Sequence, residues 1–157
     1  MSDRKEILTE IFKVKKPIIG MVHLRPLPGS PGYDRSIMGM KEIIRIALEE
    51  ARILEDNGVD GVQVENIWDF PYLKGEKIGP ETAAALGVVA ARVGETVGIP
   101  VGVDCHLNGG RIALAAAIAS GARWIRVFEW VNAYISHAGL TEGIGGELAR
   151  YRHSLRA

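Results

Sequence analysis

The chain has 157 residues, the size of one domain with a sizeable core, and we expect a single domain over residues 1–157. Its 19 basic and 19 acidic residues give a formal net charge of zero, so the composition offers no excess of Lys and Arg for binding nucleic acid. A single cysteine, Cys105, excludes an intramolecular disulfide, the charged start MSDRKEILTE argues against a secretory signal, and no apolar run predicts a membrane span. We therefore expect a soluble cytoplasmic protein, with peripheral membrane association left open.

The predicted elements begin with a short helix and then alternate between strands and helices. Ile7, Leu8, Ile11 and Phe12 share one face of the first helix, which suits a cover over the floor of a barrel. Strands are predicted over 17–23, 59–66, 99–106 and 123–130, and helices over 40–56, 80–98, 110–120 and 142–155. This alternation predicts a parallel sheet with right-handed crossovers.

The fold class predicted is α/β, a TIM-type (βα) barrel of which this chain supplies about four units. Closure of such a barrel needs about eight strands, so the first and fourth strands would be unpaired edges. We expect two copies to close a 4+4 barrel around a two-fold axis, which makes the protein a homo-oligomer. A shortened piece of a full barrel and a different open architecture are the alternatives.

The connections that follow strands are long, and those that follow helices are short. Residues 24–37, 67–79 and 131–141 leave the carboxyl ends of strands, the end at which α/β barrels bind ligands. The first of these loops is rich in proline, so it should be stiff and should hold His23 in one place.

Polar residues gather at the predicted carboxyl ends of the strands. We take His23, Glu65 and Asp104 as the catalytic candidates, with His23 as general acid or base and either carboxylate orienting its imidazole. The candidates for ligand binding are Asn66, Asp69, Arg126, Glu129, Gly109 and Gly110. The two glycines precede a helix whose free amides suit an anion, and side-chain alternation means that Glu65 and Asn66 cannot both face the barrel centre.

A metal site is a weaker reading of the same residues. His23, Asp104, His106 and Glu129 offer imidazole and carboxylate ligands, but no compact ligand motif such as H-E-x-x-H is present, so no metal is predicted and the cofactor is left open. Cys105 is expected to be a small buried core residue. The aromatic residues of the second long loop, Trp68, Phe70 and Tyr72, are expected to anchor that loop, with a substrate wall or partner surface as alternatives.

Three separated blocks carry a resemblance to a known family. IIGMVHLRPLPGSPGY, VDGVQVENIWDFPYLKGEKIGPET and GLTEGIGGELARYRHSLRA occur in that order and together resemble the BtpA/SgcQ family, whose members are (βα)-barrel proteins named for a role in photosystem I biogenesis. The resemblance implies the barrel fold. It favours as site residues those that lie in the matching blocks: His23, Glu65, Asn66, Asp69 and Pro71. It supplies no reaction.

Three functions follow from these observations. The resemblance implies an assembly or biogenesis factor for a membrane complex of the photosystem I type. The barrel geometry and the polar residues favour an enzyme that acts on a small phosphorylated or sugar-like metabolite. A barrel that kept its packing and lost its activity is the third, and fold alone does not decide among them.

Overall fold

The computed structural model describes residues 4–157, which form one four-stranded parallel sheet with helices and a small hairpin. The elements in chain order are α1 (Arg4–Phe12), β1 (Ile19–His23), α2 (Met40–Asp56), β2 (Gly61–Glu65), the 3-10 helix η1 (Gly75–Lys77), α3 (Pro80–Gly94), β3 (Val101–Asp104), α4 (Gly110–Ser120), β4 (Trp124–Ile125), β5 (Tyr134–Ser136), β6 (Gly139–Thr141) and α5 (Gly145–Ser154).

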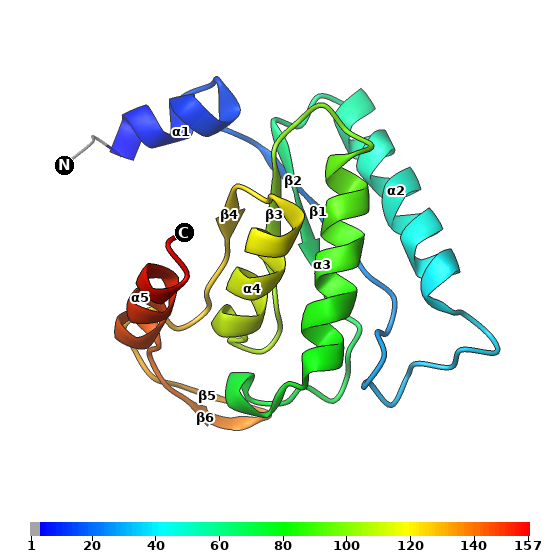
Figure 1. Ribbon diagram of the computed structural model, residues 1–157, viewed down its shortest axis with the longest axis vertical. Coiled ribbons are helices and arrows are strands. Elements are labelled where there is room, and N and C mark those ends of the chain that lie inside the picture. The colour runs from blue at the N-terminus through cyan, green and yellow to red at the C-terminus, as the bar shows by residue number, and fades with distance from the viewer. Residues whose placement is uncertain (1–3) are drawn as a thin grey trace.

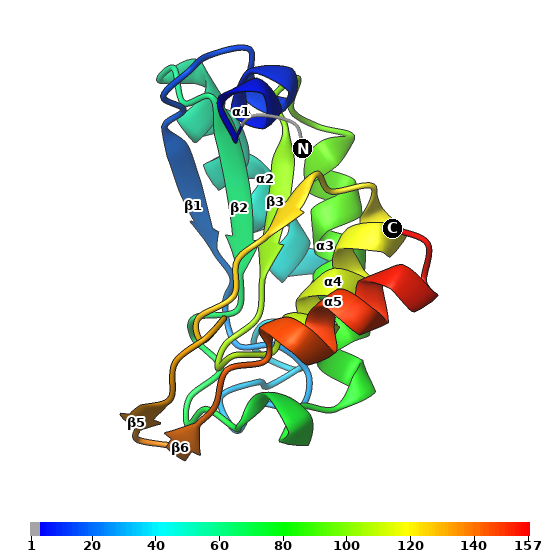
Figure 2. The ribbon, with the colours of Figure 1, turned by 90° about the vertical axis from the view of Figure 1, so that its left-hand side faces the viewer.

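The sheet has the order β1-β2-β3-β4, and every neighbouring pair is parallel. Figures 1 and 2 show α2, α3 and α4 on one face of this sheet, with α5 beyond α4. The opposite face, which would be the interior of a closed barrel, carries no helix layer (Figure 2). The predicted α/β half-barrel is therefore confirmed, and within residues 4–157 the sheet does not close into a barrel.

Strand alternation divides the sheet into an apolar and a polar side. Val62 and Val64 of β2 are fully buried in the core against the helices, so Gln63 and Glu65 point to the opposite face. The buried stripe of α2 completes this core with Ile43, Ala47 and Ala51. Polar side chains are thus directed to the barrel side by the two-residue period alone.

The floor of the sheet is covered by one residue of α1. Phe12 is buried and packs against Trp124, with ring centroids 4.8 Å apart. Only part of the expected apolar face of α1 is buried, because Ile7 and Leu8 are 45% and 37% exposed. A side chain at Gly61 would overlap Phe12 and crowd Trp124, and one at Gly102 would overlap Trp124, which explains glycine at both positions.

Several boundaries differ from the sequence-based expectation. β4 has two residues where a strand over 123–130 was expected, and the loop expected at 131–141 contains the β5–β6 hairpin. Gly139 closes the hairpin with φ of 93°, which favours glycine. α5 starts at Gly145, three residues after the expected start. Side chains at Gly143 and Gly145 would overlap the backbone of Val131 and Trp130, which explains glycine at both positions. α3 ends at Gly94, four residues before the expected end.

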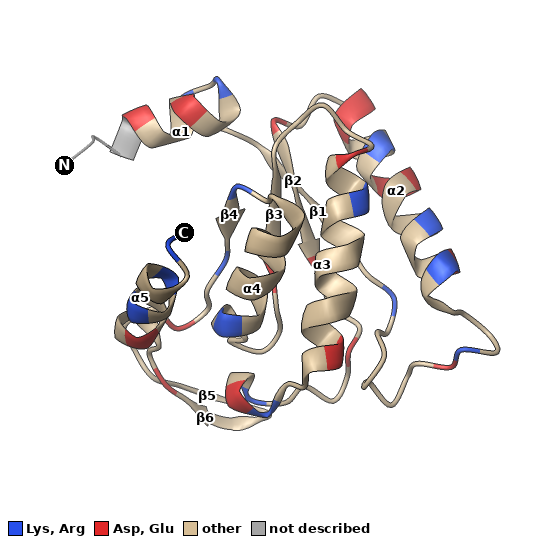
Figure 3. Cartoon of the chain, viewed as in Figure 1, with Lys and Arg blue, Asp and Glu red and all other residues tan. Residues whose placement is uncertain are grey.

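Charges of both signs are mixed on the outward surfaces of the helices (Figure 3). On α2, Arg45 forms ion pairs with Glu42 and Glu49 at 2.8 and 2.9 Å. Such exposed pairs contribute little to stability, about 0 to 1 kcal/mol each. Because the acidic and basic side chains are interleaved, the outward face of α2 is not uniformly basic. Within the described part of the chain, no helix has the length and apolarity needed to cross a bilayer.

Candidate functional site

The register of the sheet places three polar residues in a row at the carboxyl ends of the strands. His23 pairs with Glu65 across β1 and β2, and Glu65 pairs with Asp104 across β2 and β3. Arg126 follows β4, where its backbone amide still bonds to Val103 at 3.1 Å. The catalytic candidates expected from the sequence therefore lie together at one rim of the sheet, as parallel strands require.

Two carboxylates of this rim are buried and share two partners, a guanidinium and an imidazole. Glu65 and Asp104 are 1% and 0% exposed. Arg126 lies 2.9 Å from Asp104 Oδ2 and 3.4 Å from Glu65 Oε2. His106 Nε2 lies 2.8 Å from Glu65 Oε1 and 3.8 Å from Asp104 Oδ2. We call Glu65, Asp104, His106 and Arg126 the rim cluster.

The hydrogen bonds of the rim cluster are incomplete. The Cys105 amide donates to Asp104 Oδ1 at 2.8 Å and fixes that carboxylate. Asp104 Oδ2 and Glu65 Oε2 are buried and accept no hydrogen bond, although Arg126 is at ion-pair distance from both. His106 Nδ1 is buried and without a partner as well. Buried polar atoms are rarely left in this state, so each orphaned atom is a position at which a ligand would be stabilised.

Aromatic rings contact the imidazole and the guanidinium. The ring of His106 stacks on Tyr72 at 4.8 Å and meets Phe128 edge-on at 4.7 Å. Phe70 extends the stack on the far side of Tyr72, at 4.4 Å. Arg126 lies over the face of Phe128, 4.5 Å from its centroid. The expected anchoring role of the loop aromatics is thus supported for Tyr72, which stacks on both neighbouring rings, whereas Trp68 and Phe70 are 49% and 51% exposed.

The two carboxyl groups respond differently to burial. Burial raises the pKa of Asp104 to about 6, because Arg126 and His106 offset only part of the desolvation cost and Glu65 adds repulsion. Burial also acts on Glu65, but the hydrogen bond from His106 and the charges of Arg126, His106 and His23 outweigh it and lower its pKa. Neighbouring carboxyl groups with pKa values moved apart are typical of functional sites.

Asn66 and Asp69 connect the loops around the rim. Asp69 accepts hydrogen bonds from the Leu27 amide at 2.7 Å and from Asn66 Nδ2 at 2.9 Å, and Asn66 Oδ1 accepts from the His106 amide at 2.8 Å. Burial raises the pKa of Asp69. Both residues also line a pocket of about 200 Å³ with Tyr72 and His106. These hydrogen bonds support a structural role for Asn66 and Asp69 in holding the loops together. Their assignment to ligand binding stays a prediction.

The remaining candidates are less closely grouped. His23 is half-buried and lies near enough to Glu65 to influence it electrostatically, but in the described chain its ring makes no hydrogen bond, since Glu65 bonds to His106. Glu129 is buried with Oε2 unpartnered, and its amide bonds to Asn108 at 3.2 Å. The expectation that Glu65 or Asp104 orients His23 by hydrogen bonding is therefore wrong, because His106 occupies that position.

Gly109 and Gly110 lie away from the rim cluster, in the lining of a pocket of about 430 Å³ beside η1 and α5. A side chain at Gly109 would overlap Cys105, and one at Gly110 would overlap Ile144. Close packing thus explains both glycines, and their role in anion binding stays a prediction. Cys105 is 1% exposed within the core, as expected, and burial raises the pKa of its thiol.

A larger pocket, of about 510 Å³, opens between the rim and the hairpin. Tyr72, His106, Phe128 and Glu129 line it on the rim side, and the hairpin residues Tyr134 to His137 line it on the other. Neither the hairpin nor a role for Phe128 in the site was predicted from the sequence. The only signal for them was the aromatic run after β4, which looked like part of a strand.

The ligand atoms of three rim residues lie close enough to share one metal ion. One atom each from Glu65, Asp104 and His106 falls within 4.8 Å of the others. The set found among the described residues therefore contains Glu65 in addition to the expected Asp104 and His106, and it lacks the expected His23 and Glu129.

Comparisons with known proteins agree with this architecture. The profile of the BtpA family matches residues 14–157. The chain belongs to the BtpA family. It is 38% identical to an uncharacterized protein of Archaeoglobus fulgidus, with 88% of this chain and 54% of the relative covered. It is 36% identical to the photosystem I biogenesis protein BtpA of Synechocystis, with 94% and 50% covered, and 35% identical to the sgc region protein SgcQ of Escherichia coli, with 96% and 54% covered.

The chain spans about half the length of the curated relatives it matches. The described sheet likewise has four of the roughly eight strands of a closed barrel. The family match thus covers the loops that build the rim cluster, since Glu65, Asp104, His106 and Arg126 all lie within residues 14–157.

Proposed function

We propose that this BtpA-family chain carries the catalytic centre of an enzyme that acts on a small phosphorylated or sugar-like metabolite. The centre is the rim cluster together with His23, at the carboxyl ends of β1 to β4. The pocket of about 510 Å³ beside His106 has the size of a small-molecule site.

One observation carries the proposal: Glu65 and Asp104 are buried next to each other with an orphaned oxygen on each. Burying a carboxylate costs roughly several kcal/mol of folding free energy unless its partners are well placed. Two hydrophobic residues at the same positions would stabilise the fold at least as well. A cluster that lowers the stability of the fold in this way is expected where its charged groups bind a ligand or react with it.

The exposed members of the site suggest how a substrate is held. Arg126 is 41% exposed, so its guanidinium reaches both the carboxylates and the space above them. A planar guanidinium binds phosphate or carboxylate through paired hydrogen bonds, which favours an anionic substrate. His23 lies on β1, beside Glu65 of β2, and is half-buried. Its ring makes no hydrogen bond in the described part of the chain, so the imidazole is available as a general acid or base.

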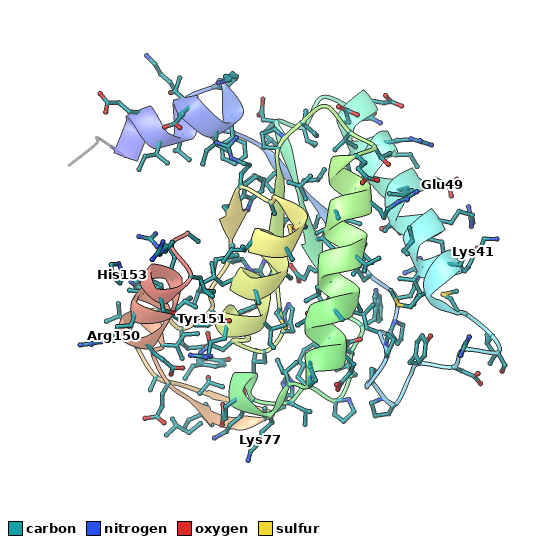
Figure 4. The ribbon with its side chains drawn as sticks, viewed as in Figure 1. Lys41, Glu49, Lys77, Arg150, Tyr151 and His153 are labelled. Atoms are coloured by element: carbon teal, nitrogen blue, oxygen red, sulfur yellow. The ribbon has the colours of Figure 1, made fainter. Side chains whose placement is uncertain are left out.

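A thermal-shift screen tests this proposal. The wild type is screened against phosphorylated sugars and phosphorylated carboxylic acids, since a ligand at one hundred times its Kd stabilises the folded state by about 2.7 kcal/mol. Arg126→Ala and His23→Ala are expected to lose the shift. His153→Ala is the matched control, because His153 is exposed on α5, far from the rim (Figure 4). No shift with the wild type, or an equal shift in all three variants, would contradict the proposal.

The name of the Synechocystis relative supports a second candidate, an assembly factor for a membrane complex of the photosystem I type. On this proposal the protein is cytoplasmic and meets the membrane only peripherally. Flotation with vesicles and affinity capture from a photosynthetic host would test it: recovery of photosystem subunits that is unchanged in Arg126→Ala favours an assembly role that does not depend on the rim cluster.

A further inference from the structure

We propose that the rim cluster binds one divalent transition-metal ion through Glu65, Asp104 and His106. The inference rests on the proposed function, because it takes the rim cluster to be a ligand-binding site, and it adds a metal cofactor to that site. Three ligand atoms from these residues already lie within 4.8 Å of one another, and all three side chains are at least nine-tenths buried.

The donor set fits this class of ion. Two carboxylates and one imidazole are ligands that Zn²⁺, Mn²⁺ and Fe²⁺ accept, and three protein ligands leave positions open for water or substrate. His106 Nε2 is 2.8 Å from Glu65 Oε1 and 3.8 Å from Asp104 Oδ2. Ligands that each sit about 2.1 Å from one ion are roughly 3 Å apart, so small side-chain movements would complete the site.

The unpartnered oxygens supply an independent observation. Asp104 Oδ2 and Glu65 Oε2 are buried, accept no hydrogen bond and lie on the two carboxylates of the set. The opposite oxygen of Asp104 is held by the Cys105 amide at 2.8 Å, which orients the carboxylate as an outer-sphere hydrogen bond does in metal sites. A cation at the centre of the set would give Asp104 Oδ2 the partner that it lacks, and a rotation of the Glu65 carboxylate would bring Oε2 to the same ion.

Arg126 occupies the position of the cation in the present arrangement. Its guanidinium lies 2.9 Å from Asp104 and 3.4 Å from Glu65, but without the geometry of a hydrogen bond to either orphaned oxygen. Because 41% of its side chain is exposed, it can turn toward solvent when a metal ion binds. The displaced guanidinium would then be free for the anionic group of a substrate, so metal and substrate binding are expected to support each other.

The test measures metal binding directly, by calorimetry and atomic absorption with Zn²⁺ and by electron paramagnetic resonance with Mn²⁺, on the chain freed of metal by chelation. We expect one ion per chain. Asp104→Asn and Glu65→Gln keep the shape of the side chain and should weaken binding at least about tenfold. Arg126→Gln removes the competing cation and should tighten binding.

Glu129→Gln is the matched control, because Glu129 is a buried carboxylate of the same rim that is not part of the three-residue set. It should bind metal within about twofold of the wild type, a change small beside the tenfold loss expected for a ligand. No binding by the wild type would overturn the proposal. So would equal losses in Asp104→Asn and Glu129→Gln, or weaker binding by Arg126→Gln. Circular dichroism of each variant confirms that it is folded.

The metal inference and the proposed function can fail separately. A metabolite that stabilises the chain equally with and without chelator supports the enzyme and overturns the metal site. Stoichiometric metal binding that depends on Asp104, without any metabolite response, supports the metal site and contradicts the enzyme as proposed.

Discussion

Glu65 and Asp104 are direct neighbours across the β2–β3 pair, and both side chains are almost completely buried. Two adjacent carboxylates in a parallel sheet repel each other unless cations lie between or above them. In this chain the partners come from outside the strands: the guanidinium of Arg126 lies beside both carboxylates, and the imidazole of His106 forms a hydrogen bond with Glu65. The stability of the rim therefore depends on two loop residues that local sequence does not bring together.

Removal of the Arg126 charge should destabilise the chain. We expect Arg126→Met to lower the free energy of unfolding by about 1 to 3 kcal/mol, less than for a fully buried pair because the guanidinium is partly exposed. Adding Asp104→Asn removes one of the two uncompensated charges and should recover at least half of the loss. Urea unfolding of both variants measures this, and a double variant less stable than Arg126→Met would show that Asp104 is not the uncompensated charge.

Asp69 should make stability depend on pH. Burial raises its pKa above the ordinary value of 3.8, so the folded state holds the proton to a higher pH than the unfolded state. This stabilising contribution is fully present below 3.8 and is lost as pH rises through the raised pKa. The stability of the wild type relative to Asp69→Asn should therefore fall over that window. Urea unfolding of both proteins across the window checks it, and parallel curves would contradict the assignment.

Two glycines should respond in opposite ways to alanine. A Cβ at Gly102 would overlap the indole of Trp124, which is held by a hydrogen bond to Gln63 at 3.1 Å, so Gly102→Ala should destabilise the chain by about 1 to 3 kcal/mol. A Cβ at Gly87, inside α3, would meet only Ala116 at 3.8 Å. Gly87→Ala should stabilise by about 0.5 to 1 kcal/mol. Thermal unfolding compares the two, and changes of the same sign would refute the packing argument.

The two unpaired edges predict self-association. β1 and β4 are the outer strands of the described sheet, and we propose that two copies close a 4+4 barrel by pairing them. Multi-angle light scattering should then give twice the mass of one chain. Alternation places the Met21 amide on the free edge of β1, so Met21→Pro should give a folded monomer. A wild type that remains monomeric at high concentration would rule out closure between copies.

The position of the rim could be predicted from the sequence, but its partnerships could not. His23, Glu65 and Asp104 end apolar runs, and parallel strands carry such residues to one edge, which the register confirms. The hydrogen bond from His106 to Glu65 depends on how the chain turns after β3, and the approach of Arg126 depends on how it leaves β4. No local pattern encodes those paths.

The sequence by itself determined the order of four strand and helix units, because apolar runs and helix periodicity are local properties of the chain. It also determined that polar groups would meet at the carboxyl ends. Only the tertiary structure decided that β4 stops after Ile125, that a hairpin follows, and that His106 displaces His23 as the partner of Glu65. The hairpin itself is local, since it pairs Tyr134 with Thr141 and Ser136 with Gly139. The partnership of Glu65 with His106 joins residues that lie far apart in the sequence, and it forms only when the sheet and its loops pack together.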